Sequence, residues 1–453
     1  MKVCVMIMSI IKNLKKIIKL LISKVIIHIK NYPQCYKENM RNPLSENPRV
    51  IVAGRNYCSN LTMARAIGYA GYEVEILRIF QYKPHFFTLG KFIRADAYSK
   101  YIKSYHTCVA RKKNKRIVKR LMEIADVNKK MLLIPVDDLV ANAIDEYMDE
   151  LKPYYIMPNV KHTQGELSRL MSKNIQKELA RKANLPVVNC CVINAENGNF
   201  EIPNTVKYPC FVKPNISKNA FKTDMKKCEN REELERWLEK ISAKKDVEML
   251  VEDFIDIDTE LALLGVSTSD SVFIPVCMEA EAEGHDARRG VAMSGHIVSC
   301  GEIQGLVDKI AKFIKSLQYE GLFDVDLIRT TDGKILFTEL NLRFGGSGYA
   351  VTQSGVNLPG MFADYMLKGK AVDLECTVKE TGKCFVNEKV LLDEYAHDYL
   401  TKNDVEKIMK KADIHFIKDE DDFLAWQHFK KFFILVNKLK WLIRLKLWLK
   451  NKS

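Results

Sequence analysis

The stretch Phe337–Gly348 decides the fold, and it reads Phe-Thr-Glu-Leu-Asn-Leu-Arg-Phe-Gly-Gly-Ser-Gly. Its alternation of apolar and polar residues predicts a β-strand that carries Glu339, Asn341 and Arg343 on one face. A carboxylate beside a carboxamide offers the hard oxygen ligands that Mg²⁺ takes together with substrate phosphates. The arginine suits a carboxylate or phosphate group. A solvated polar face of an amphipathic strand is the alternative to such a site.

A second strand is predicted just upstream, at Asp324-Val-Asp326-Leu-Ile-Arg. The turn Thr331-Asp332-Gly333-Lys334 joins it to the first strand as a hairpin. In this hairpin, we expect Asp326 to reach the same metal ion as Glu339 and Asn341.

An aspartate on one strand followed by Glu-x-Asn on the next resembles the ATP-grasp superfamily. The resemblance is to the branch similar to the carbamoyl-phosphate synthetase large subunit and biotin carboxylase. It runs from about Val50 to Leu367 and is strongest between Tyr208 and Gly360. It implies ATP as a substrate and Mg²⁺, or Mn²⁺, as the metal. The metal ligands that it implies are Asp326, Glu339 and Asn341.

The order of elements predicts an α/β chain. A buried strand Arg49–Gly54, a helix from Ser59 to Ala70 and a strand from Gly71 to Leu77 form a βαβ start. The pattern recurs with a strand Met131–Val136 and a helix Leu139–Leu151, which indicates a small parallel sheet. The resemblance implies an α+β ATP-grasp fold, in which this pre-ATP-grasp domain precedes a two-lobed antiparallel domain.

The predicted domains follow from these elements and from composition. They are a basic amphipathic helix at 1–30, a linker at 31–48, the pre-ATP-grasp domain at 49–160, the ATP-grasp domain at 161–370, a C-terminal extension at 371–422 and a second basic amphipathic helix at 423–453.

Two lysines are candidates for binding nucleotide phosphates. Lys213 lies in an otherwise apolar strand that begins at Tyr208, where a lysine is costly unless it is paired. The resemblance assigns phosphate binding to Lys213 and also to Lys173, near the start of the predicted helix Leu167–Ala183. A solvated helix position is the alternative for Lys173.

The loop after Lys213 departs from the family. Residues Asn215–Ala220 contain no glycine, whereas the family usually has a glycine-rich loop that closes over the phosphates. Backbone amides, helped by Lys218 or Lys222, would then bind phosphate. The departure bears on turnover more than on nucleotide binding.

The resemblance also implies an adenine site. Glu252 would accept a hydrogen bond from the adenine amino group, and Glu260 would bind the ribose hydroxyls. Backbone groups would read the edge of the base at Asp253, Phe254 and Ile255. A charged edge of a strand–turn–strand unit is the alternative for the two acids.

Two further pairs of residues are candidates. Arg288 and Arg289 lie in a glycine-bounded loop and would hold an acyl phosphate or an acidic acceptor, unless the loop is simply solvated. Asp137 and Asp138 stand at a predicted strand end. They either serve the site or cap the following helix.

The charge is concentrated at the two ends of the chain. The net charge is +14, residues 1–30 carry +7 and residues 423–453 carry +8, which leaves −1 for the 392 residues between them. A nearly neutral body argues against nucleic-acid binding. The 12 cysteines show no C-x-x-C spacing, which favours reduced thiols in the cytosol over disulfides or a zinc site.

Both ends are also amphipathic. Apolar residues recur at helical spacing with lysines between them, and three of the four tryptophans fall in or next to the second end. We expect helices that lie on the inner face of the cell membrane, because neither segment offers the roughly 18 uncharged residues of a spanning helix. Packing of these helices on the body is the alternative.

These features predict an ATP-dependent carboxylate–amine ligase that works through an acyl phosphate. Its substrates would be a small carboxylate and an amine, one of them an amino acid or a membrane-linked cell-wall or surface-glycan precursor. An ATP-grasp phosphotransferase is the second hypothesis. A nucleotide-binding scaffold without turnover is the third.

Overall fold

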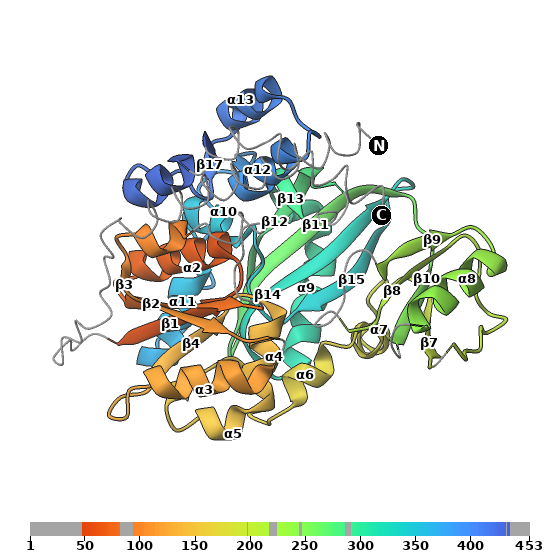
Figure 1. The fold of residues 1–453 in the computed structure, drawn as a ribbon, viewed down its shortest axis with the longest axis horizontal. Helices are drawn as coiled ribbons and strands as arrows, with labels where there is room; N and C mark the ends of the chain where they lie inside the picture. Colours follow the sequence, from red (N-terminus) through yellow and green to blue (C-terminus); the bar gives the residue numbers. More distant parts are fainter. Residues whose placement is uncertain are drawn as a thin grey trace, which may run out of the picture.

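The computed structural model describes residues 48–81, 94–111, 113–196, 198–216, 224–243, 247–285, 291–431 and 433–434. These residues form three sheets with helices packed around them (Figure 1). The predicted helix at 1–30 and nearly all of the predicted linker at 31–48 lie outside the described residues. So do Lys218 of the glycine-free loop, Lys222 just after that loop, Arg288, Arg289 and the stretch 435–453.

The first sheet is parallel, with the strand order β3-β2-β1-β4-β5. Its strands are β1 (Arg49–Gly54), β2 (Glu73–Phe80), β3 (Ile102–Val109), β4 (Met131–Pro135) and β5 (Tyr155–Ile156). Its helices are α2 (Tyr57–Tyr69), α3 (Asn114–Ile124), α4 (Asp138–Glu146) and α5 (Met148–Leu151), with a 3₁₀ turn η2 (Ala95–Tyr98).

Strand β1 explains why this sheet is buried on both faces. Val50 and Val52 pack with α2, whereas Ile51 and Ala53 pack with α3 and α4. A continuous apolar run is typical of a central parallel strand covered on both sides. The predicted parallel sheet is therefore confirmed. The predicted helix Leu139–Leu151 is instead two helices, α4 and α5, which meet at Tyr147.

The second sheet is a small antiparallel lobe in the order β7-β10-β8-β9. Its elements are β7 (Cys190–Ala195), β8 (Cys210–Pro214), β9 (Lys226–Cys228), β10 (Val247–Asp253) and α8 (Arg231–Ser242). The side chain of Asn230 caps α8 by accepting a bond from the Glu233 amide. Leu234 and Leu238 pack onto the sheet and form a core separate from the rest of the molecule.

The third sheet is the largest, in the order β15-β14-β11-β12-β13-β16-β17, with β6 paired to β14. Its strands are β6 (Asn159–Val160), β11 (Ile257–Ser267), β12 (Val272–Glu283), β13 (Ala292–Val298), β14 (Tyr319–Thr330), β15 (Ile335–Asn341), β16 (Cys384–Val386) and β17 (Ile414–His415). The 3₁₀ turn and helices that follow or connect these strands are η6 (Gly301–Ile303), α9 (Gln304–Ser316), α10 (Gly348–Gln353), α11 (Leu358–Lys368), α12 (Glu388–Ala396) and α13 (Lys402–Lys411).

Two short helices connect the first sheet to the small lobe. They are α6 (Glu166–Leu170) and α7 (Lys173–Lys182), where a single helix Leu167–Ala183 was predicted. Ser172 causes the break, because its side chain accepts a bond from the Ile175 amide and caps a new helix. Lys173 is therefore the first residue of α7. In Figure 1, α7 lies between the small lobe and the large sheet.

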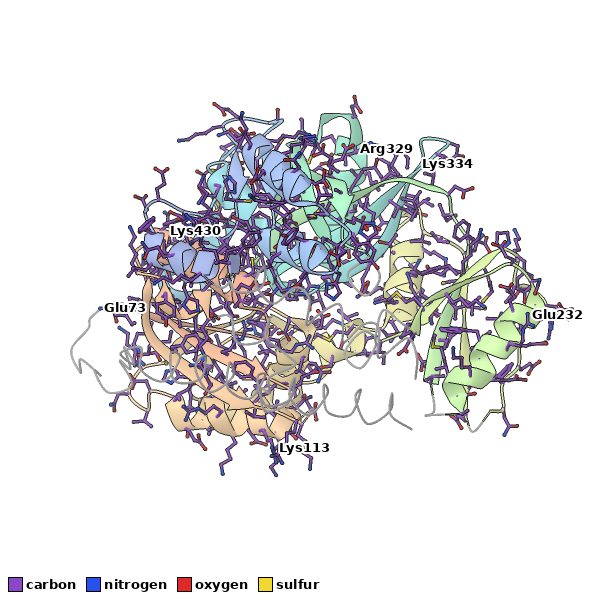
Figure 2. The ribbon with its side chains drawn as sticks, turned by 45° about the horizontal axis from the view of Figure 1, so that its top comes forward. Glu73, Lys113, Glu232, Arg329, Lys334 and Lys430 are labelled. Carbon is purple, nitrogen blue, oxygen red and sulfur yellow. The ribbon has the colours of Figure 1, made fainter. Side chains whose placement is uncertain are left out.

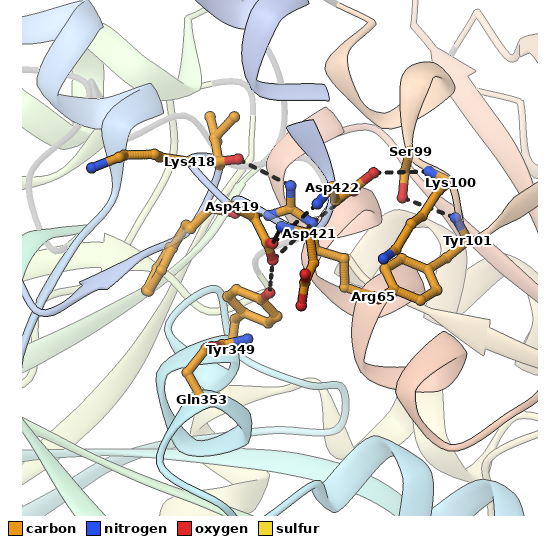
Figure 3. Close-up of polar contacts among 12 residues, drawn as sticks. Arg65, Ser99, Lys100, Tyr101, Tyr349, Gln353, Lys418, Asp419, Asp421 and Asp422 are labelled. Atoms are coloured by element: carbon orange, nitrogen blue, oxygen red, sulfur yellow. Dashed lines mark hydrogen bonds and ion pairs between the residues drawn. The ribbon is translucent and has the colours of Figure 1, made fainter. Parts of the chain in front are cut away.

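A buried arginine ties the C-terminal extension to the first sheet. Arg65 of α2 is fully buried and donates to the Asp422 carboxylate at 2.9 Å and to the carbonyls of Phe416 and Ile417 at 3.0 Å (Figure 3). Asp419 lies 3.8 Å from the same guanidinium group. Residues 371–422 thus complete the fold, since β16 and β17 extend the large sheet and the ion pair holds the end of this extension against α2.

The described start of the second basic segment packs on the body. Residues 423–431 are helical, with Ala425 and Phe429 in the main core and Trp426 packed against it. Phe423 and Leu424 of the same stretch are exposed. Charged side chains such as Lys113, Glu232 and Lys430 project outward from the molecule (Figure 2). None of the helices in the described residues is long and apolar enough to cross a bilayer.

Candidate active site

The hairpin of β14 and β15 brings the predicted metal ligands together. Asp326 faces Glu339 and Asp324 faces Asn341 in the antiparallel register. Asn341 Nδ2 donates to Asp326 Oδ2 at 2.9 Å, and Arg343 Nη2 donates to Asn341 Oδ1 at 3.1 Å. The predicted hairpin is confirmed, and all four side chains named in the sequence motif lie in one cluster with Asp324 beside them.

The carboxylates of the cluster are buried close to one another, and this raises the pKa values of two of them. Burial and the charge of Glu339 raise the pKa of Asp326 to about 6. Burial and the charge of Asp326 raise the pKa of Asp324 well above its usual range, although Arg343 opposes the shift. Two juxtaposed carboxylates and a carboxamide form a donor set that fits Mg²⁺, and a divalent cation would relieve their repulsion.

Lys173 reaches the same cluster from α7. Its Nζ lies 2.5 Å from Glu339 Oε1, and only 3% of the residue is exposed. Gln176 fixes the helix against β15, because its side chain accepts from the Leu340 amide and donates to the Leu340 carbonyl, both at 2.8 Å. The phosphate role of Lys173 stays a prediction, but the solvated alternative is wrong.

A second cluster lies at the junction of α7 and the small lobe. Lys213 Nζ of β8 is 2.9 Å from Glu252 Oε2, and Lys177 Nζ is 2.6 Å from Glu252 Oε1. Burial disfavours the charge of Lys213, but Glu252 overrides it and raises the pKa of the lysine. Burial lowers the pKa of Lys177. Lys177 was not predicted from the sequence, although its i, i+4 spacing from Lys173 places both on one helix face.

The predicted adenine-reading residues follow Glu252 on β10. The amides of Asp253 and Phe254 donate to the carbonyls of Asn189 and Pro209, both at 3.1 Å. Phe254 and Ile255 are half-buried, and Glu260 lies in β11. The Glu252 carboxylate faces two lysines, so its adenine contact stays a prediction.

Helix α4, which follows β4 of the first sheet, contacts the carboxylate cluster of β14 and β15 directly. Arg343 Nε donates to Asp138 Oδ1 at 3.0 Å, and the Arg343 guanidinium lies 3.6 Å from Asp324. Asp137 instead caps α4 by accepting from the Val140 amide at 3.1 Å. The two predicted roles at this strand end are thus divided between the neighbours: one aspartate caps the helix and the other holds the arginine.

Comparison with known proteins identifies the fold around these clusters. Residues 178–360 match the family model described as the ATP-grasp domain. The chain contains an ATP-grasp domain. The matched range includes the strands β8, β10, β14 and β15, which carry residues of both clusters. It begins after Lys173 and Lys177, which are assigned to the site because of the contacts that α7 makes.

The proteins that this chain is similar to include ligases by name. It is 25% identical over 304 residues to the D-aspartate ligase of Enterococcus faecium (strain Aus0004), which covers 63% of this chain and 72% of that protein. Its fold resembles an L-amino acid ligase from Bacillus licheniformis, with a TM-score of 0.52, 15% identity and coverage of 72% and 75%.

A third likeness is to the biotin carboxylase domain of the Hydrogenobacter thermophilus 2-oxoglutarate carboxylase, determined with MgADP and bicarbonate. The TM-score is 0.56 at 15% identity, and the match covers 75% of this chain and 73% of that one. At these identities the two structural likenesses show a shared fold. The predicted α/β ATP-grasp architecture, with a parallel sheet before the antiparallel ones, is confirmed.

Proposed function

We propose that this protein is an ATP- and Mg²⁺-dependent ligase that joins a carboxylate to an amine and releases ADP and phosphate. One observation carries the proposal: the carboxylate cluster of β14 and β15 and the buried lysines of α7 and β8 meet around one site in an ATP-grasp domain. The names of the D-aspartate ligase and the L-amino acid ligase support the same reaction class.

The lysines would bind the nucleotide by exchanging partners. Lys173 and Lys213 are each paired with a carboxylate in this structure, and the phosphates of ATP would replace Glu339 and Glu252 as their partners. Glu252, with the backbone of Asp253, Phe254 and Ile255, would read the adenine, and Glu260 would bind the ribose.

The residues that would hold the metal are Asp326, Glu339 and Asn341. Bound there, Mg²⁺ (or Mn²⁺) would disperse the charge of the terminal phosphates during transfer. Glu339 is the residue shared between the two sets of contacts, since it is close to Lys173 and faces Asp326 across the hairpin.

The chemistry needs positioning and charge stabilisation more than a protein nucleophile. A carboxylate oxygen of the substrate attacks the γ-phosphorus, and the bond from this phosphorus to the bridging oxygen breaks. The electron pair of that bond stays on the oxygen, which leaves as part of ADP. The amine then attacks the acyl phosphate, phosphate departs and the amine proton goes to solvent or a base, which leaves an amide. Arg343, oriented by Asp138, is placed to hold the carboxylate or acyl phosphate. Arg288 and Arg289 are proposed for the same anion.

The proposed substrates are an amino acid and a second carboxylate or amine, with a membrane-linked cell-wall or surface-glycan precursor as the acceptor. The two amphipathic basic ends support a site of action at the inner membrane face of the cytoplasm. Salt tests this: we expect the full-length protein to sediment with anionic vesicles in 50 mM salt and to leave them in 1 M salt. Failure to bind at low salt would refute the membrane location.

Two other functions use the same site. A phosphotransferase would leave the phosphoryl group on its acceptor, and a nucleotide-binding scaffold would release no ADP. The glycine-free loop after Lys213 favours the scaffold, whereas the assembled carboxylate cluster favours turnover.

The deciding experiment is a screen for ADP release against amino acids and membrane-extracted acceptors, with product masses. The ligase hypothesis expects an amide, whose mass is the sum of the two substrates less one water. A product heavier by one phosphoryl group would instead identify a phosphotransferase. Glu339→Gln should abolish Mg²⁺-dependent ADP formation, whereas Glu235→Gln on the exposed face of α8 should not change it. Full activity of the Glu339 variant would refute the site.

A further inference from the structure

A cavity of about 470 Å³ opens on the side of α7 away from the nucleotide lysines. It lies between the end of β6, α6, α7 and α9. Its volume is in the range of small-molecule sites in proteins. None of the residues assigned above to ATP, metal or substrate lines it.

The cavity is strongly cationic. Five basic residues line it, and Glu166 is the one acidic residue in the lining. That acid is paired with Arg169, with 3.1 Å between Nη2 and Oε2. Among the residues that the structure describes, no carboxylate lies within ion-pair distance of the remaining four, which are Lys161, Lys182, Lys309 and Lys312.

These four lysines come from three separate elements. Lys161 follows β6, Lys182 ends α7, and Lys309 and Lys312 lie one turn apart on α9. The positive charges of these lysines repel one another, and an anion bound between them would be attracted to all four.

Part of the lining of the cavity is apolar. Leu170 of α6, Leu179 of α7, and Phe313 and Leu317 at the end of α9 line it together with the lysines. These side chains belong to or pack against the core of the large sheet. A ligand that fits both parts of the lining has an anionic group and an apolar body.

The backbone beside the cavity is held in an unusual conformation. Lys161 and His162 have φ of +55° and +51°, and Gln318 has φ of +54°, although none of them is glycine. The Lys161 amide donates to the Gln318 carbonyl at 3.0 Å, so the two strained segments are joined. Residues kept in this sparsely populated region cluster at ligand sites.

Helix α7 connects the cavity to the nucleotide site. Leu179 and Lys182 face the cavity, whereas Lys173 and Lys177 face the carboxylate clusters. The helix has only 10 residues and is about 15 Å long, so its two ends lie close together. A shift of its C-terminal turn against α9 would displace both lysines.

We propose that this cavity binds a phosphate monoester carried on an apolar body and that its occupancy changes nucleotide affinity through α7. The binding is independent of the ligase activity. The coupling rests on the proposed function, because it requires Lys173 and Lys177 to contact the nucleotide.

Hexyl phosphate is the probe, with hexanol and inorganic phosphate as matched controls for its two parts. Calorimetry on the full chain, with the nucleotide site saturated by a non-hydrolysable ATP analogue, should show hexyl phosphate binding at least tenfold more tightly than either control. Binding should weaken as salt rises from 50 to 500 mM. Equal binding of hexanol and hexyl phosphate would overturn the proposal.

Charge reversal on α9 locates the site. Lys309→Glu/Lys312→Glu should weaken hexyl phosphate at least tenfold while thermal melting shows a folded protein. The control Lys407→Glu/Lys410→Glu makes the same change at the same spacing on exposed positions of α13 and should stay within twofold. Unchanged binding in the α9 variant, or equal loss in both variants, would refute the cavity as the site.

The coupling is read from the affinity of a fluorescent ATP analogue. Hexyl phosphate should change the Kd of the ATP analogue at least threefold in the native protein and should leave it unchanged in the α9 variant. In the reverse measurement, the ATP analogue should change the Kd of hexyl phosphate by the same factor. Bound hexyl phosphate with unchanged nucleotide affinity would refute the coupling. If the native protein binds hexyl phosphate as expected but releases no ADP in the substrate screen, that result would count against the proposed ligase function and not against the cavity as a binding site.

Discussion

Replacing Glu252 with glutamine removes the carboxylate that is paired with both buried lysines, Lys177 and Lys213. The carboxylate lies 2.6 Å from Lys177 Nζ and 2.9 Å from Lys213 Nζ, and the three side chains are 8%, 0% and 12% exposed, respectively. Removing one partner of a buried ion pair typically destabilises a protein by about 3–5 kcal/mol, because the other charge stays buried. We expect a loss of that size, or a factor of about 10² to 10⁴ in the unfolding equilibrium.

Urea unfolding followed by circular dichroism measures the loss at pH 7.5, with and without ATP. If the phosphates take the place of Glu252 beside Lys213, ATP should stabilise the variant more than the native protein, because it supplies the missing negative charge. The control Glu235→Gln breaks an exposed i, i+4 pair with Arg231 and should cost less than about 0.5 kcal/mol.

The pH dependence gives the same experiment an internal check. Burial opposes the charge of Glu252, but Lys213 and Lys177 override it and lower the pKa of the carboxyl group below its usual value. Its stabilisation is therefore present above about pH 4.3, the ordinary pKa of glutamate, and is lost as the pH falls through the lowered pKa. The stability curves of the native protein and the variant should converge in acid.

The outcome also separates two roles of Glu252. A variant that keeps its stability without nucleotide but no longer prefers ATP over GTP would refute the ion-pair reasoning. It would instead place the adenine amino group against this carboxylate. A loss below about 1 kcal/mol with unchanged nucleotide preference would contradict both roles.

Three further variants test the rest of the site and its framework. Asp326→Asn should be at least as stable as the native protein at pH 7.5 without metal. Burial and the charge of Glu339 raise the pKa of Asp326 to about 6. The charged form of Asp326 therefore destabilises the fold increasingly as the pH rises from about 4 to above 6. In urea unfolding, the difference in stability between the variant and the native protein should vanish near pH 4. Arg343→Lys should lower the rate of ADP formation about 100-fold and keep the Kd for ATP within threefold of the native value, because lysine keeps the charge but loses the planar guanidinium fork. ADP formation at the native rate would exclude a bidentate role of Arg343. Arg65→Met should cost about 3–5 kcal/mol by leaving Asp422 buried without its partner, and a calorimetric loss below 1 kcal/mol would refute the anchoring role.

The clustering of the side chains on β14 and β15 could be predicted from the sequence because the information for it is local. Glu339, Asn341 and Arg343 lie within five residues, and a four-residue turn brings Asp326 opposite Glu339. Period-two alternation and a turn are signals that a single sequence carries. The break between α6 and α7 is also encoded locally, since Ser172 is a favourable N-cap, but a single helix was predicted across it.

The partners of these residues could not be predicted in the same way. Arg343 is oriented by Asp138, which lies 205 residues away at the start of α4, and Arg65 meets Asp422 across 357 residues. Nothing in local propensity distinguishes such an aspartate from a helix cap. The distinction arises only when the parallel sheet docks on the hairpin, and it is this docking that selects Asp138 over Asp137.

The lysines and carboxylates of the site are arranged for exchange of partners more than for maximal stability. Lys173 is close to Glu339 and Lys213 is close to Glu252, so neither ammonium group is buried without a counter-charge before the nucleotide arrives. Phosphates that displace Glu339 from Lys173 release a carboxylate next to Asp326, where a second negative charge is already unfavourable. Displacement of the carboxylate and binding of a divalent cation therefore favour each other. Under the proposed function, we therefore infer that nucleotide and metal would favour each other's binding, because each removes the electrostatic cost that the other creates.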